Sequence, residues 1–268
     1  MRLILQEIKS QFSIKSMLGL LVIAIACLVA GSVQSRSYIL RDQLDLLGLV
    51  MNLILPLVFP VLVLIVYVFQ FVGEVRHRAL VYTRTRISIV HLLAVKQTAN
   101  MWTTFIVFAC MTLLIFMYVY VVDPLYVHTS FYPERFGINS MNHAQNMYMR
   151  HTFTSFLQYG TFAFAGIYCI WVGIFACLYA GIALQLVILL SNSLLAISLP
   201  YIFYILASFL CSVIPGLYYF QPFRVIFPLY DVQAPLWTAL LTLAVHMFIF
   251  IGLRQLIQRR LRRGEVLT

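Results

Sequence analysis

Charge is scarce in this chain of 268 residues. Only 10% of the residues are Asp, Glu, Lys or Arg, and 63% are hydrophobic. A soluble domain has about 25% charged and roughly 45–50% apolar residues. A water-soluble core of this length cannot absorb such an excess of apolar side chains. The composition therefore excludes an ordinary soluble domain and predicts an all-α membrane protein, in which lipid surrounds most of the chain.

Sequence patterns of catalysis are also missing. The chain has no GxxxxGK[ST] loop to hold nucleotide phosphates, no HExxH zinc pattern and no GxSxG nucleophile pattern. Ionisable residues inside a membrane usually mark a function, but the one clear example within a predicted span is His246, which we interpret as a hydrogen-bonded packing residue. His143 and His151 lack a third ligand. We expect no catalytic residue, no metal site and no cofactor in this chain.

Cysteine is present only in apolar runs. No two cysteines form a CxxC pair, so the sequence predicts neither a disulfide framework nor a zinc site. We interpret all five as small packing residues within helices. They are Cys27, Cys110, Cys169, Cys177 and Cys211.

Six apolar segments have the length of a membrane span, about 20 residues. In chain order they are residues 17–33, 46–72, 99–122, 153–190, 194–215 and 236–257. The fourth is too long for one straight crossing, so we expect part of it to lie beyond the lipid. Pro56 and Pro60 each remove a backbone donor from the second span and predict a bend. Residues 1–268 form a single transmembrane domain in this interpretation.

Residues 1–15 have the pattern of a helix that lies in the membrane interface. Leu5, Ile8 and Phe12 share one helical stripe, and most of the polar residues lie elsewhere. The competing interpretation is a signal peptide with a cleavage site at Ala30-Gly31-Ser32. The long, patterned leading segment and the even number of spans favour an uncleaved interfacial helix.

Basic residues are distributed unequally over the connections between spans. If both termini and the 73–97 connection share one side, that side holds 13 of the 18 basic residues, three of the eight acids and the whole net charge of +10. Basic excess marks the cytoplasmic side. We therefore predict a multi-pass protein of the cell (inner or plasma) membrane with both termini in the cytoplasm. Lys15, Arg84 and Arg262 are expected inside, and the residues expected outside are Arg41, Arg135 and Arg224.

Two further features concern packing and shape. In the fourth span a small residue recurs at every fourth position, which allows close approach of helix backbones. The residues of this small-residue stripe are Ala165, Cys169, Gly173, Cys177 and Gly181. Residues 216–235 carry aromatic residues and three prolines, which predicts a re-entrant or interfacial segment at the outer side.

The connection at residues 73–97 is the longest polar passage between two apolar ones. It holds five basic residues against the single acid Glu74. Ile87, Val90 and Leu93 or Ala94 share one helical face, and Thr85 or Ser88 could cap the helix start. A short cytoplasmic helix of this kind inserts its apolar face into the groove of a partner or lies on the membrane. An ordinary basic loop is the alternative.

This layout resembles the permease subunits of type-2 ABC exporters. In that family a Glu near the end of the second span is followed by a Pro-Ile/Val-Ser turn and an apolar run that ends in Gly-Lys. Glu74, Ile87-Ser88 and the run HLLAVK ending at Lys96 match these features. The chain departs from the pattern at Arg78-Ala79-Leu80, where the family has Gly-Thr-Leu, and at Arg86 and Val95, which replace the Pro and the Gly.

The resemblance implies a half-transporter that exports peptides, drug-like molecules, lipids, polysaccharides or ions. A second permease subunit, identical or related, and cytoplasmic ABC ATPase subunits would complete it, with ATP and magnesium bound by the ATPase. The 73–97 segment would be the coupling helix seated in the ATPase. Its partner-binding residues would be Glu74, Arg78, Arg84, Arg86, Ile87, Ser88, Val90, His91, Leu93 and Lys96. The alternatives are a stand-alone membrane interaction or immunity-type protein, and a membrane enzyme.

Overall fold

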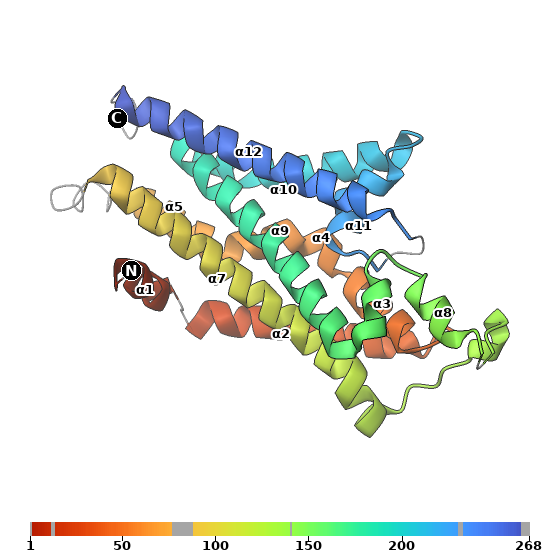
Figure 1. Ribbon diagram of the computed structural model, residues 1–268. Helices are drawn as coiled ribbons and strands as arrows, with labels where there is room; N and C mark the ends of the chain where they lie inside the picture. The colour runs from red at the N-terminus through yellow and green to blue at the C-terminus, as the bar shows by residue number, and fades with distance from the viewer. Residues whose placement is uncertain (1, 12–13, 77–87, 140, 230–232, 264–268) are drawn as a thin grey trace.

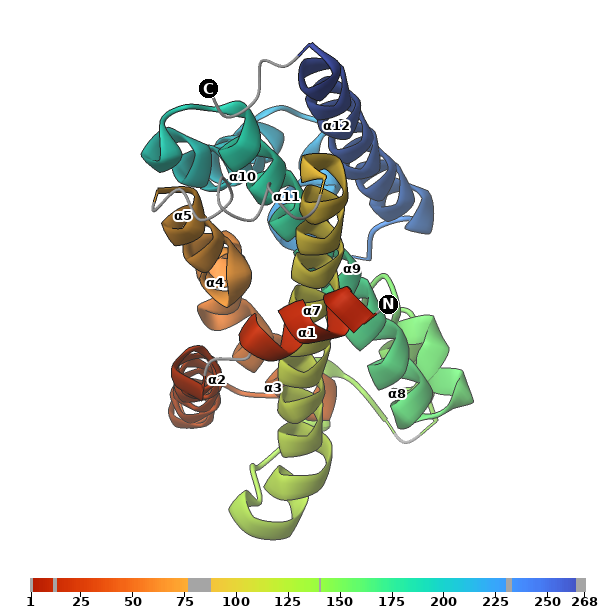
Figure 2. The same ribbon diagram turned by 90° about the vertical axis from the view of Figure 1, so that its left-hand side faces the viewer.

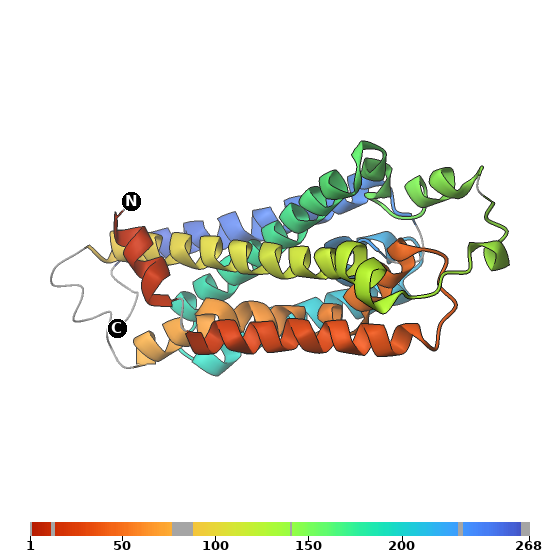
Figure 3. The same ribbon diagram turned by 90° about the horizontal axis from the view of Figure 1, so that it is seen from below.

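The computed structural model describes residues 2–11, 14–76, 88–139, 141–229 and 233–263. The described elements are helical, and no β-strand is among them. The chain runs along the long axis of the molecule in successive passes, so that both termini lie near one end (Figures 1 and 3). This confirms an all-helical membrane protein as the class of fold.

The first third of the chain contains an amphipathic helix followed by two passes. The elements are α1 (Arg2–Gln11), α2 (Ile14–Ser35), α3 (Gln43–Leu53), α4 (Leu55–Val63), the π-helical segment η1 (Leu64–Val68) and α5 (Phe69–Arg76). The predicted bend of the second span is a break at Ile54, whose φ of −128° interrupts the helix between α3 and α4. Pro56 follows directly, in the first turn of α4, where a missing N–H costs little.

The remaining elements form four passes and a connection at the opposite end of the molecule. They are α7 (Ile89–Met117), the π-helical η2 (Tyr118–Val127), η3 (Pro133–Phe136), α8 (His143–Tyr148), η4 (Thr154–Tyr159), α9 (Thr161–Leu189), α10 (Ser193–Val213), η5 (Tyr218–Phe220), α11 (Pro222–Ile226) and α12 (Leu236–Arg262).

Five of these helices are long and apolar enough to cross a membrane. They are Leu55–Arg76, Ile89–Val127, Thr161–Leu189, Ser193–Val213 and Leu236–Arg262. The first predicted span, residues 17–33, lies within α2, whose apolar part Leu21–Ser35 is shorter than these five helices. The sixth crossing therefore stays a prediction.

The long fourth segment is divided by a glycine. Gly160 has φ +107°, which a residue with a Cβ rarely adopts, and it separates the 3₁₀ turn η4 from α9. The predicted segment is thus divided into η4 and α9, and α9, with 29 residues, is still longer than the roughly 20 residues that one straight crossing needs.

Aromatic side chains fill the centre of the molecule around Phe59 of α4. Its ring meets Phe108 of α7 at 5.3 Å and Phe227 at 5.5 Å between centroids. α9 is the most enclosed of the long helices, whereas α10 and α12 present most of their apolar surface outward. The outward faces are the surface that lipid would cover.

The segment predicted as re-entrant packs back onto the helices. α11 contacts α4, α9, α10 and α12, and the indole N–H of Trp171 donates a 2.7 Å hydrogen bond to the carbonyl of Val225. The amide of Asn52 donates to the carbonyl of Leu229 at 3.0 Å. These bonds satisfy irregular backbone that apolar surroundings would otherwise leave unpaired.

Candidate functional site

The predicted partner-binding segment is described only at its two ends. Arg78, Arg84, Arg86 and Ile87 lie outside the described residues. Glu74 lies in the last turns of α5, and Ser88 immediately precedes α7. The positions from 89 to 96 form the first turns of the long helix α7, and they are not a separate short helix.

A buried lysine joins the two ends of this segment. The Nζ of Lys96 lies 2.6 Å from the Oε2 of Glu74 and 2.8 Å from the Oε1 of Glu7 in α1. The hydroxyl of Tyr67, in the π-helical η1, donates to the same Glu7 oxygen at 2.9 Å. We call these four residues the Lys96 cluster.

Burial separates the predicted partner-binding residues into two groups. Leu93 and Lys96 are 5% and 6% exposed, and Leu93 belongs to the chain's own hydrophobic core. Leu93 is therefore not available as an anchor for another protein. Val90 is 55% exposed, and Ser88 and His91 are also exposed. An apolar contact with a partner at this end would use Val90.

Helix α1 packs across α7, where the Lys96 cluster lies (Figure 2). Ile4 and Ile8 pack against the core, whereas Leu5, on the predicted apolar stripe, is 56% exposed. The face that meets α7 thus contains Ile4, Glu7 and Ile8, which follow helical spacing. Both apolar packing by Ile4 and Ile8 and the ion pair of Glu7 with Lys96 therefore hold α1 on the helices.

A second charged cluster lies at the opposite end of the molecule. The guanidinium of Arg150 donates to both oxygens of Asp42, at 2.9 and 2.8 Å, and to Asp45 at 2.9 Å. It also donates to the side-chain oxygen of Asn146 at 2.7 Å. Arg41 contacts Asp45 at 2.8 Å. We call these five residues the Arg150 cluster; it fastens the connection after α8 to the start of α3.

Asp42 and Asp45 also organise the local backbone. The Asp42 side chain accepts from the backbone N–H groups of Leu44 and Asp45 and so caps α3. Burial alone would raise the pKa of Asp45, but hydrogen bonds from Arg41 and the charges of Arg150 and Arg41 outweigh it and hold this pKa below its ordinary value. Asp45 is therefore ionised at neutral pH and pairs with the guanidinium groups of Arg41 and Arg150.

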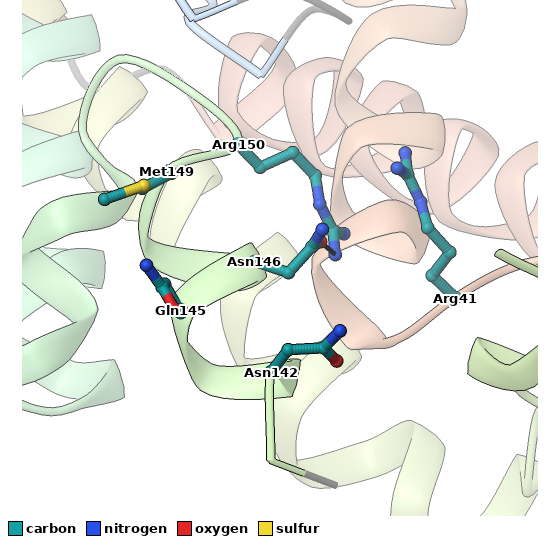
Figure 4. Close-up of a pocket in the computed structure, with 6 residues that line it drawn as sticks. All are labelled: Arg41, Asn142, Gln145, Asn146, Met149 and Arg150. Atoms are coloured by element: carbon teal, nitrogen blue, oxygen red, sulfur yellow. Dashed lines mark hydrogen bonds between the residues drawn. The ribbon is translucent and has the colours of Figure 1, made fainter. Parts of the chain in front are cut away.

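The Arg150 cluster forms one wall of a pocket of about 320 Å³. Figure 4 shows Asn146 of α8 beside the guanidinium of Arg150, whereas Gln145 of the same helix points away from the two arginines. The lining residues are Arg41, Asn142, Gln145, Asn146, Met149 and Arg150. Because both guanidinium groups are already paired with carboxylates, the pocket presents neutral hydrogen-bonding groups rather than a free charge.

The small-residue stripe of α9 lies in the contact between α9 and its neighbours. A Cβ atom on Gly173 would come within 2.9 Å of the Phe105 ring in α7, and one on Gly181 within 2.7 Å of the Phe250 ring in α12. Ala165 and Cys169 are buried, and Cys177 is half-buried. Nearby, the Asn100 amide donates to the carbonyl of Ala180 at 2.8 Å. The stripe therefore lies at helix contacts within one chain.

His246 is buried in the membrane-spanning part of α12. One ring nitrogen lies 2.8 Å from the carbonyl oxygen of Thr242, and the other lies 3.0 Å from the hydroxyl of Tyr179. Both nitrogens are thus engaged in hydrogen bonds, as expected for a packing histidine. Among the described residues, no three His, Cys, Asp or Glu side chains are grouped so that they could hold a metal ion.

In the sequence, several residues of the Lys96 and Arg150 clusters contributed only as charges that were counted to assign each side of the membrane. Glu7 is 89 positions from Lys96, and Asp42 is 108 positions from Arg150, so neither pair follows from local spacing. The available signal was an ionisable residue on an otherwise apolar helix face, such as Lys96 beside the core residue Leu93.

The fold and the two clusters define a helical, membrane-embedded protein with paired charges at both ends of its helices. No protein-family model, curated protein or solved structure matches this chain.

Proposed function

We propose that this chain is the membrane-spanning permease subunit of an ATP-driven exporter similar to the type-2 ABC class. In this proposal it pairs with a second permease subunit and with a cytoplasmic ATPase that binds ATP and magnesium. Its cargo would be a peptide, a drug-like molecule or a lipid. The supporting observation is the Lys96 cluster, because it links both ends of the proposed coupling segment to a third helix.

The mechanical argument follows from the geometry of the cluster. A coupling segment must transmit a push from a partner to the helices on either side of it. The 2.6 Å ion pair between Glu74 and Lys96 ties α5 to α7, and Glu7 adds α1 to the same unit. A displacement of the segment would then move three helices together, which is the kind of rigid-body motion that alternates access in transporters.

The exposed residues at this end identify where the partner would bind. Val90 and His91 are exposed in the first turn of α7, and Arg76 at the end of α5 is also exposed. An apolar anchor that fills a partner's groove contributes about 2 kcal/mol or more, whereas an exposed ion pair contributes roughly 0–1 kcal/mol. Val90 is therefore the residue on which the partner contact should depend most.

Affinity purification of the tagged full-length chain in mild detergent tests the proposal. We expect a soluble protein with a GxxxxGK[ST] loop to co-purify, and Val90→Asp to reduce its recovery about tenfold or more. Met141→Asp is the matched control, since Met141 is 98% exposed at the other end of the molecule. Recovery should not change in that variant.

Nucleotide binding gives an independent measurement. The isolated chain should not bind ATP, and ATPase activity should belong to the co-purified subunit and respond to reconstitution with this chain. The proposal is wrong if no such ATPase accompanies the wild-type chain, or if Val90→Asp recovers and stimulates it as well as the wild type does.

A further inference from the structure

A pocket of about 810 Å³ lies between α5 and the turn that joins α9 to α10. It is at the end of the molecule where both termini lie (Figures 1 and 2). α5 forms one wall, and the Ser191-Asn192-Ser193 turn forms the other together with the first turns of α10. The pocket is therefore built where the polar ends of membrane-spanning helices meet at one side of the membrane.

The α5 wall changes from apolar to charged along one helix face. Phe69, Val72 and Arg76 are spaced by three and four residues, so their side chains share that face. Seven helical residues span about 10 Å, so Arg76 lies at the end of the helix and Phe69, which is 46% exposed, lies deeper. The opposite wall has the same order, with Ser191 in the turn and Ile197 in the second turn of α10.

The guanidinium of Arg76 is available to bind an anion. Arg76 is exposed, and no carboxylate in the described part of the chain forms an ion pair with it. Glu74 is only two positions away, but residues two apart do not share a helix face, and Glu74 pairs with Lys96 at 2.6 Å. A guanidinium of this kind forms charge-assisted hydrogen bonds with phosphate oxygens.

The turn opposite Arg76 offers neutral hydrogen-bonding groups. The side-chain oxygen of Asn192 already accepts from two backbone N–H groups of α10, so the chain itself caps this helix, and the NH₂ group of Asn192 remains as a donor. Ser191 and Asn192 are exposed, so a ligand in the pocket can reach them. Arg260 of α12 donates to the carbonyl of Leu189 at 3.0 Å and holds the turn from another side.

We propose that this pocket binds an anionic phospholipid with a hydroxylated headgroup, of which phosphatidylglycerol is the simplest. Arg76 binds the phosphate, Ser191 and Asn192 bond to the glycerol hydroxyls, and one acyl chain runs along Phe69 and Ile197. The choline group of phosphatidylcholine would instead bring a second cation next to Arg76. In the predicted topology the pocket faces the cytoplasmic leaflet, which carries the negative surface potential of the membrane. The site needs no ATPase, so it is independent of the proposed function.

Native mass spectrometry of the full-length chain in mild detergent tests this proposal by counting bound lipids. Titration with phosphatidylglycerol should show one tight site, and phosphatidylcholine should bind about tenfold more weakly. Arg76→Gln should lower the affinity for phosphatidylglycerol about tenfold, the effect of one charge-assisted hydrogen bond. Arg259→Gln is the matched control, because it removes the same charge from an exposed position near the end of α12. It should change the affinity less than twofold.

Two further measurements test the neutral groups and the acyl chain. Ser191→Ala should lower the affinity for phosphatidylglycerol about two- to tenfold, as the loss of one neutral hydrogen bond does. Ser212→Ala, at an exposed serine near the other end of α10, should not change it. Glycerophosphoglycerol, which is the same headgroup without acyl chains, should not displace the lipid at equal concentration.

Three results would overturn the proposal. Equal affinities for the two lipids would show that the pocket does not recognise the headgroup. Equal losses in Arg76→Gln and Arg259→Gln, or no loss in Arg76→Gln, would show general attraction to a basic surface. Displacement by glycerophosphoglycerol would assign the site to a soluble phosphate compound.

Discussion

Lys96 forms ion pairs with two carboxylates from two different helices. Its side chain is 7% exposed, and those of Glu7 and Glu74 are 19% and 26% exposed. Breaking a fully buried pair costs about 3–5 kcal/mol, and an exposed pair contributes roughly 0–1 kcal/mol. The partial exposure of both carboxylates places this cluster between the two limits.

We predict that Lys96→Met lowers the free energy of unfolding by about 2 kcal/mol, because Glu7 and Glu74 would then repel each other without a cation between them. Lys9→Met, which removes an exposed lysine of α1, should change it by less than about 0.5 kcal/mol. Thermal unfolding in mild detergent measures both. Adding Glu74→Gln to Lys96→Met should restore part of the loss; a double variant no more stable than the single one would contradict the electrostatic explanation.

The role of Glu74 and Lys96 in binding a partner stays a prediction. Glu74 and Lys96 were selected as the ends of one motif, and the structure brings them together. The partner role of Leu93 was assigned from its helical face alone. A face pattern cannot tell whether an apolar residue meets another protein or its own chain, and here Leu93 is buried within the chain.

At the scale of single elements, α9 shows how small residues determine helix separation. Gly173 faces the Phe105 ring. A Cβ atom added to Gly173 would also lie 3.3 Å from the carbonyl oxygen of Phe105. Gly166 of the same helix has nothing within 4 Å of the same added atom. The two glycines therefore allow one substitution to be compared in crowded and open surroundings.

Gly173→Leu should destabilise the protein by about 1–3 kcal/mol, since overpacking forces α7 and α9 apart. Gly166→Leu should be neutral or stabilising by up to about 1 kcal/mol, because leucine is the better helix former. The difference in thermal midpoint between the two variants in detergent measures the effect. Equal midpoints would mean that the stripe does not control the helix contact.

The proline-rich helix α4 depends on a hydrogen bond from another helix. Pro60 has no N–H, so the carbonyl of Pro56, four residues earlier, loses its helical donor. The hydroxyl of Tyr204 in α10 donates to that carbonyl at 2.7 Å, and Tyr204 is completely buried. A tyrosine 148 positions away thus completes the backbone of α4, which no local pattern predicts.

We predict that Tyr204→Phe destabilises the protein by about 1–3 kcal/mol, because it leaves the Pro56 carbonyl unsatisfied. The Pro60→Ala substitution restores the N–H donor. In that background, Tyr204→Phe should destabilise the protein by at least about 1 kcal/mol less than it does in the wild type. A double-mutant cycle on unfolding free energies measures this coupling. Tyr201→Phe on the same helix is the control and should destabilise both backgrounds equally. If Tyr204→Phe also destabilises both backgrounds equally, the Tyr204 hydroxyl does not replace the missing N–H of Pro60.

Across the whole molecule, hydropathy predicted the helical class and five of the long apolar helices. It did not predict where α9 begins, because the φ of Gly160 ends η4 independently of hydrophobicity. It also did not predict that residues 89–94 continue directly into α7. The Arg150 cluster also depends on folding, since it joins residues 108 positions apart. Periodicity describes which faces are apolar, whereas these features depend on single backbone angles and long-range pairs.

The charge distribution makes a prediction about the molecule as a whole. Both termini lie near the end that holds the Lys96 cluster, whereas η3 and α8 lie at the other end (Figure 3). The described basic residues at the first end include Arg76 of α5 and the exposed arginines that end α12. At the other end, acids accompany the arginines in the Arg150 cluster. Because basic excess is retained in the cytoplasm, we expect the Lys96 end to face inward.

Cysteine labelling measures this orientation. In a variant in which the five native cysteines are replaced, Arg135→Cys of η3 should react with a membrane-impermeant maleimide in intact cells. Arg262→Cys at the end of α12 should react only after the cells are permeabilised; both positions are exposed, so access depends on the membrane alone. Met141→Cys and Arg76→Cys serve as second positions at the two ends. Reaction of Arg262→Cys but not Arg135→Cys in intact cells would show the opposite orientation. Val90 would then lie outside the cell, where it could not meet a cytoplasmic ATPase.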